Sequence, residues 1–67
     1  MNEITIGSLW RSRRDASNMR IIRHISQVRV YGPHAYFIEY YSSVQGCSMT
    51  TVTGLGEWLS HFELMDA

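Results

Sequence analysis

Hydrophobic and polar residues alternate along two long stretches in the middle of the chain. The first, residues 19–31, is rich in β-branched side chains, and the second, residues 35–43, is the most aromatic part of the sequence. Alternation at period two is typical of strands that bury one face. Gly32 and Pro33 separate the stretches, and strand pairing should end there because proline donates no backbone hydrogen bond. The pattern predicts a long, bent β-hairpin.

The alternation also predicts which side chains of residues 19–31 face the core. The inward-facing side chains are expected to be Met19, Ile21, Val28 and Val30. The alternation slips in the middle of this stretch, since Ile22 and Ile25 do not fit the same face. A β-bulge or bend within residues 23–27 would absorb the slip and would let the strand pass from one sheet to another.

In residues 35–43, Glu39 decides which face is buried, because an unpaired carboxylate is expensive to bury. Phe37 and Tyr41 share the face of Glu39, so these two aromatic side chains are expected to point outward. The opposite face is then the buried one, and its members are Tyr36, Ile38 and Tyr40.

Three shorter segments also have the composition of strands. They are residues 4–11, residues 47–53 and residues 61–65. In the first of them, Trp10 is expected to anchor one side of the core. Residues 11–18 form a polar loop before the hairpin, in which Asp15, Ser17 and Asn18 can bond their own backbone.

The period changes just before the last predicted strand. Apolar residues recur there at positions i, i+3, i+4 and i+7, the spacing of one helix face, as Leu55, Trp58, Leu59 and Phe62. The segment is about two turns long and contains two glycines, which weaken a helix. We expect one short α-helical or 3₁₀ turn, capped by Thr53 or Gly54 and packed as a plug on one end of the fold.

The predicted order is strand, loop, long bent strand, strand, strand, helical turn and short strand. This order indicates an all-β fold, a five-stranded antiparallel barrel that is partly open and forms one domain over residues 1–67. The chain resembles SH3-like small barrels in three places. Residues 7–10, Gly-Ser-Leu-Trp, open the first strand, residues 11–18 form a long loop, and a short helical turn precedes the last strand.

The chain is also similar to short barrel proteins encoded by bacteria and their phages, through the pattern Leu-x-x-Trp-Leu-x-x-Phe at residues 55–62. An OB-type barrel is the nearest alternative, although such barrels are usually longer. These resemblances cover most of the chain and imply a fold, and a fold does not imply a function.

Charge is distributed unevenly over this predicted fold. Six cationic and six acidic side chains give a formal net charge of zero. All six cations are arginines between Arg11 and Arg29, where six arginines against two acids make residues 1–29 net +4. Residues 30–67 contain four acids and no cation and are net −4. Folding mixes the two halves in space, so this asymmetry does not by itself define a charged patch.

The sequence lacks the disulfides and metal sites that stabilise many small domains. Cys47 is the only cysteine, which excludes an intrachain disulfide, and with His24, His34 and His61 it gives no metal-ligand spacing. We therefore expect no metal and no cofactor. A chain of this length buries only about 60% of its unfolded surface, so coverage by a partner or assembly into a homo-oligomer would help to stabilise it.

The expected location is the cytoplasm of a bacterial or phage-infected cell. A single unpaired cysteine indicates a reducing setting. Residues 1–6 have neither the basic region nor the apolar core of a secretory signal, and no apolar run approaches the roughly 20 residues of a membrane helix. We expect no membrane partner.

No catalytic motif stands out in the sequence. It contains no nucleophile elbow, phosphate loop or metal motif. A small barrel also has little room for a buried pocket of about 300 Å³, the lower end of the usual size for ligand sites. We expect no enzymatic activity and no small-molecule substrate.

The favoured function is recognition of a protein surface. Aromatic residues and arginine are enriched at interface hot spots. The predicted contact residues are Arg20, Arg29, Tyr31, Phe37 and Tyr41. The partner would be a host or phage protein, or a second copy of the chain. The competing interpretation is that a thin barrel cannot bury every ring.

The alternative function is nucleic-acid binding. Phosphates would be contacted by Arg11, Arg13, Arg14, Arg20 and Arg29. Tyr31 or Phe37 would provide a stacking platform for a base. The net charge of zero argues against this function, because phosphate affinity comes from released counterions and needs a sustained positive field. The arginines would otherwise form a solvated loop paired with acidic residues.

Overall fold

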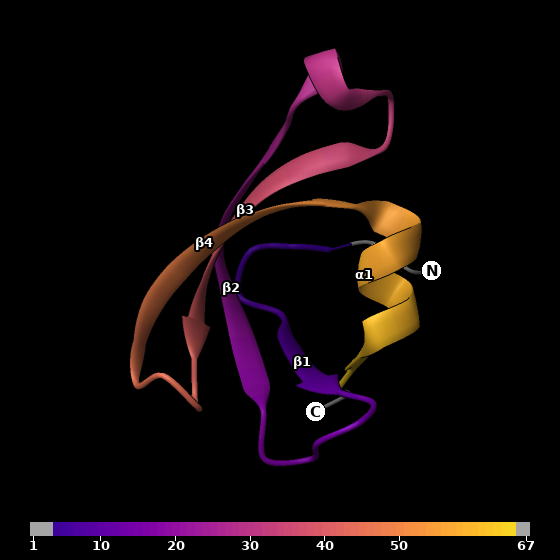
Figure 1. The fold of residues 1–67 in the computed structure, drawn as a ribbon. Helices are drawn as coiled ribbons and strands as arrows, with labels where there is room; N and C mark the ends of the chain where they lie inside the picture. Colours follow the sequence, from indigo (N-terminus) through magenta and orange to yellow (C-terminus); the bar gives the residue numbers. More distant parts are fainter. Residues whose placement is uncertain (1–3, 66–67) are drawn as a thin grey trace.

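Five antiparallel strands form one open sheet in the computed structural model, which describes residues 4–65 (Figure 1). The strands are β1 (Leu9–Ser12), β2 (Met19–Gln27), β3 (Ala35–Ser42), β4 (Cys47–Gly54) and β5 (Phe62–Leu64). A 3₁₀ helix, η1 (Arg29–Tyr31), follows β2, and one α-helix, α1 (Leu55–His61), connects β4 to β5. The strand order is β4-β3-β2-β1-β5. The mainly β fold with one short helix before the last strand is confirmed, but the sheet does not close into a barrel.

The hairpin of β2 and β3 carries the predicted bulge. The register runs from Arg20 opposite Ser42 to Gln27 opposite Tyr36. It shifts between Ile22 and His24, within the part of the strand where a bulge was expected. The extra residue lets β2 bend as it crosses the middle of the sheet.

The bulge also decides which face of β2 is buried. Ile22 lies opposite Tyr40, and Ile25 lies opposite Ile38, so the two isoleucines share one face although three positions separate them. Ile22 is only 1% exposed, whereas Ile21 is 39% exposed. The prediction that Ile21 faces inward is wrong, because the next residue, Ile22, is the one on the buried face.

The second strand ends earlier than the sequence predicted. Residues 29–31 form η1, and Gly32 follows with φ of +118°, a conformation that favours glycine. Val30 is 85% exposed in this turn, so the prediction that it faces inward is also wrong. Met19 lies on the same outer side as Ile21, so its predicted inward orientation is wrong too, and it is half-buried, as is Val28. The chain leaves the sheet at Val28, so the side chains that alternate beyond that point do not belong to a strand with a buried face.

The core lies on one face of the sheet, here called the inner face. Its buried apolar residues are Ile4, Trp10, Ile22, Ile38, Tyr40, Trp58 and Phe62. Tyr36 packs against this core, so the predicted inward face of β3 and the role of Trp10 are confirmed. The outer face is the opposite side of the sheet.

Helix α1 closes the inner face with the stripe that its sequence predicted. Gly54 is its N-cap, and Leu55, Trp58 and Leu59 turn toward the core. The helix ends at His61, and Phe62 opens β5. The Trp58 and Phe62 rings stack with centroids 4.5 Å apart, which joins the helix to β5.

Two neighbouring isoleucines test this assignment of faces. Ile22→Ala should lower the free energy of unfolding by about 2–5 kcal/mol, because it leaves a cavity in a packed core. Ile21→Ala should lower it by about 1 kcal/mol or less, because that side chain stays partly in water. Urea denaturation followed by tryptophan fluorescence measures both. Equal losses for the two variants would contradict the assignment.

Candidate functional site

Apolar side chains lie in register across the outer face. Leu9 on β1 lies opposite Ile21 on β2, and Ile21 lies opposite Tyr41 on β3. Tyr41 is 39% exposed, as Ile21 is, and Leu9 is half-buried. A second pair lies nearer the hairpin tip, where Phe37 is opposite the 50% exposed Val52 of β4. We call these five residues the outer apolar face.

A polar row divides the outer apolar face into two parts. His24 on β2 lies opposite Glu39 on β3, and Glu39 lies opposite Thr50 on β4. His24 and Thr50 are exposed, and Glu39 is half-buried. The larger apolar part therefore spans β1, β2 and β3, and the smaller part adjoins the edge of β4.

The five predicted contact residues occupy three separate places. Phe37 and Tyr41 lie on the outer face, as their alternation predicted. Arg29 and Tyr31 lie in η1, at the tip of the hairpin, which projects beyond the body of the fold (Figure 1). Arg20 lies on the inner face. The two aromatic residues of β3 share the outer face, on either side of Glu39, and are separated from the other three predicted residues.

Arg20 extends the core instead of serving the outer face. It lies two residues before Ile22, so its side chain points to the inner side. Its guanidinium carbon is 4.2 Å from the centre of the Tyr40 ring and 4.4 Å from that of Phe62. The centre of the Trp58 ring is 5.6 Å away. The guanidinium therefore lies over the aromatic cluster.

The charge of Arg20 has no acidic partner within hydrogen-bonding distance in the described residues 4–65. Its Nε atom is buried without a hydrogen-bond partner there. Burial lowers the pKa of Arg20, because removal from water disfavours the charged form. Sequence reasoning placed this residue with the exposed arginines because alternation alone does not reveal the aromatic rings below it.

The remaining predicted phosphate contacts are dispersed as well. Arg11 donates to Oε2 of Glu63 from Nη2 at 2.9 Å and from Nε at 3.2 Å. Arg13 lies 3.8 Å from the other oxygen of Glu63, and its Nε donates to the carbonyl of Leu59 at 3.1 Å. Arg11 thus joins β1 to β5, and Arg13 joins the loop after β1 to β5 and α1. Arg14 is exposed in the loop, and Arg29 lies at the opposite end of the molecule.

The loop that carries Arg13 and Arg14 is held by its own hydrogen bonds. Oδ1 of Asp15 accepts from the Ser17 hydroxyl at 2.7 Å and from the Ser17 N–H at 3.0 Å. These bonds lower the pKa of the Asp15 carboxyl, because they favour its charged form. Asn18 N–H donates to the Asp15 carbonyl at 3.0 Å. The predicted turn chemistry of this loop is confirmed.

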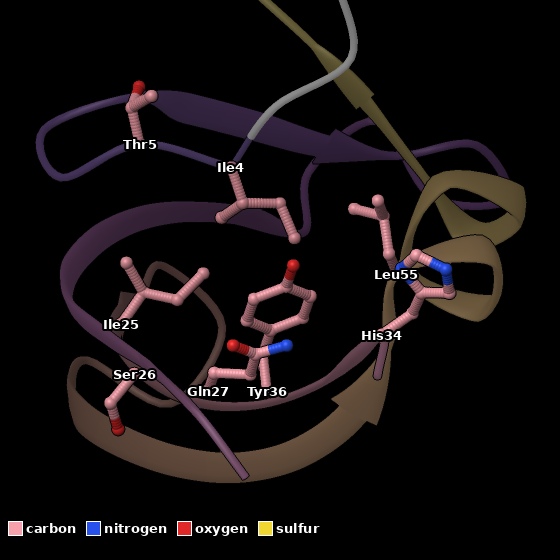
Figure 2. Close-up of a pocket in the computed structure, with 8 residues that line it drawn as sticks. All are labelled: Ile4, Thr5, Ile25, Ser26, Gln27, His34, Tyr36 and Leu55. Atoms are coloured by element: carbon pink, nitrogen blue, oxygen red, sulfur yellow. The ribbon is translucent and has the colours of Figure 1, made fainter. Parts of the chain in front are cut away.

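A cleft of about 470 Å³ opens between the hairpin, the first described residues and the start of α1 (Figure 2). Its lining residues are Ile4, Thr5, Ile25, Ser26, Gln27, His34, Tyr36 and Leu55. Figure 2 shows the Tyr36 hydroxyl directed between Ile4 and Leu55. The cleft is open to solvent, so it does not contradict the expectation that the fold has little room for a buried pocket. Four separate chain segments form the cleft, so no local pattern could have revealed it.

The cleft holds few groups that could carry out chemistry. Gln27 is engaged, since its Nε2 donates to the Pro33 carbonyl at 2.5 Å. Within residues 4–65, no group of three or more His, Cys, Asp or Glu side chains is placed to hold a metal ion.

In the same part of the chain, no helix has both the length and the apolar character to cross a membrane.

No known protein family matches the sequence, and no curated protein and no solved structure is significantly similar to the chain.

The stacked position of Arg20 can be tested against that of Arg14. Arg20→Ala should lower the free energy of unfolding by about 1–2 kcal/mol, because the stem and guanidinium leave the Tyr40 and Phe62 rings. Arg14→Ala removes the same side chain from an exposed position and should change stability by no more than about 0.5 kcal/mol. Urea denaturation of the two variants gives the comparison. Similar values would show that Arg20 does not pack on the rings.

Proposed function

We propose that this protein is a small, non-enzymatic binding module of the SH3-like type, phage or bacterial in kind and cytoplasmic, which recognises another protein through its outer apolar face. The observation that carries this proposal is the cross-strand row of Leu9, Ile21 and Tyr41 on the side of the sheet opposite the core. The partner is a host or phage protein with a complementary apolar surface.

The strand arrangement supports the SH3-like part of the proposal. β1 pairs with both β2 and β5, and the bulged β2 also pairs with β3. A long polar loop separates β1 from β2, and one short helix lies directly before β5. A small barrel of this type has the same order of elements, and α1 spans the side on which β4 and β5 remain unpaired.

The composition of the outer apolar face supports a protein partner. An exposed tyrosine offers a large apolar surface with a polar hydroxyl at its end. This combination suits a surface that is in contact with water in the free protein and is buried in a complex. Aliphatic neighbours such as Ile21 keep water away from such an anchor when a partner covers it. The core cluster fills the inner face, and this row lies on the opposite side of the sheet.

The arginines give less support to the nucleic-acid alternative. Arg11 and Arg13 are drawn to Glu63, and Arg20 lies over the aromatic cluster. Arg14 lies in the loop after β1 and Arg29 in η1, so the two arginines belong to separate segments and do not form one cluster. With a net charge of zero, the protein lacks the sustained positive field on which phosphate affinity depends.

A double substitution tests the outer apolar face. Ile21→Ser with Tyr41→Ser should reduce capture of the partner by at least about tenfold, because truncation of an interface anchor costs about 2 kcal/mol or more. The measurement is a pull-down with the purified protein from the source cells, with the bound proteins quantified by mass spectrometry. The wild-type chain defines which proteins count as specifically captured.

The hairpin tip provides a matched control. Val30→Ser with Tyr31→Ser removes the same kinds of side chain from positions that are more exposed, 85% and 72%. This variant should capture the same proteins as the wild type. If the tip variant loses the partner and the outer-face variant retains it, the proposed surface is wrong.

A further inference from the structure

The two edges of the sheet differ in how well they are protected. β5 has three residues, and its Glu63 binds Arg11 and Arg13. β4 has eight residues, and no charged residue or proline occurs anywhere between Glu39 and Glu57. Natural sheets usually blunt an edge with charges, proline or a very short strand. None of these devices protects β4.

The register shows which backbone groups β4 leaves open. Leu55 N–H donates to the His34 carbonyl at 2.8 Å, and the β3–β4 pairing continues from there without a shift. In an antiparallel pair, alternate residues direct their N–H and C=O groups toward the partner strand. Ser48, Thr50 and Val52 therefore direct theirs away from β3, to the free edge.

The side chains beside these groups are exposed too. Ser48, Met49 and Thr50 are exposed, and so is Val52. Figure 1 shows β4 curving along one side of the fold, with α1 beginning only after its end. Three successive pairs of backbone donors and acceptors are thus open to a further strand over the middle of β4.

We propose that the free edge of β4 binds the same edge of a second copy of this chain, with the two strands antiparallel and related by a two-fold axis at Thr50. This interface uses the strand edge and shares only Val52 with the outer apolar face; the row of Leu9, Ile21 and Tyr41 lies on other strands. A dimer of this kind is closed, because each copy has only one such edge and uses it fully.

The absence of charge favours a second copy as the occupant. In a symmetric strand pair each residue meets a chemically similar neighbour, and like charges directly opposite one another are the common obstacle. The neutral stretch of β4 removes that obstacle. It also offers no charge with which to select a foreign peptide. The dimer would extend the sheet and cover backbone that a small, marginally stable domain otherwise leaves in water.

The geometry selects the register of the dimer. Residues that direct their groups to the edge must meet residues of the same kind, so Thr50 lies opposite Thr50 of the second copy. Ser48 then lies opposite Val52 of that copy, and the outer faces of the two sheets are continuous. A slip by one residue would place outward side chains opposite inward ones.

Cysteine cross-linking tests the register. In a Cys47→Ser background, Thr50→Cys should give a disulfide-linked dimer under mild oxidation, because the two Cα atoms would lie about 5.5 Å apart, within disulfide range. Ser48→Cys is the matched control on the same edge. Its two copies would lie about 14 Å apart, so it should remain unlinked. Equal cross-linking of both variants would overturn the proposed pairing.

Solution mass tests the dimer itself. The wild-type protein should show twice its chain mass of 7.8 kDa in light scattering as its concentration rises toward about 1 mM. Thr50→Lys should be monomeric, because two ammonium groups would meet at the axis. Thr50→Pro should be monomeric and folded, because its missing N–H faces the free edge and not β3. Gln45→Lys, in the exposed turn before β4, should remain dimeric.

The outcomes separate this interface from the outer apolar face. If the wild-type protein is still monomeric at about 1 mM, the proposal is overturned. Binding of an extended foreign peptide to the β4 edge of that monomer would not rescue it. A dimer that persists in Thr50→Lys and dissociates in the Ile21→Ser, Tyr41→Ser variant would place self-association on the outer apolar face instead. Loss of partner capture in the latter variant with an intact dimer would support both surfaces.

Discussion

Burial of the Trp58 side chain connects the parts of this fold that are far apart in the sequence. Its ring meets Trp10 of β1 at a centroid distance of 5.9 Å, Tyr40 of β3 at 6.3 Å and Phe62 of β5 at 4.5 Å. The open sheet has no pairing between β4 and β5, so the helix between them must hold the two ends by side-chain packing. The Trp58 ring therefore joins β1, β3 and β5 through one buried side chain.

Arg20 completes the same cluster from the side of β2. At this position a charged side chain, and not an aliphatic one, packs over the aromatic rings. The Nε atom of Arg20 is buried there without a hydrogen-bond partner in the described residues, which is unfavourable. This use of an arginine changes the electrostatic picture, since the residue no longer contributes to a basic surface. Two further arginines, Arg11 and Arg13, form ion pairs with Glu63, so part of the charge asymmetry of the sequence is compensated within the fold.

The inner face is packed by the core, whereas the outer apolar face and the β4 edge are exposed to solvent. They differ in the chemistry they offer. The outer apolar face presents side chains in cross-strand register, whereas the edge presents backbone groups with almost no side-chain selectivity. The two proposed contacts would thus be specified differently, one by side chains and one by strand geometry.

The sequence alone determined the features that depend on neighbouring residues: the hairpin, the turn at Gly32 and Pro33, the buried face chosen by Glu39, and the helical stripe around Trp58. Tertiary structure decided the buried face of β2, because a single extra residue at the bulge reverses which isoleucine meets the core. It also decided the position of Arg20 and the openness of the β4 edge. Alternation is a local signal, whereas burial depends on which distant strand or ring lies opposite, and no local pattern contains that information.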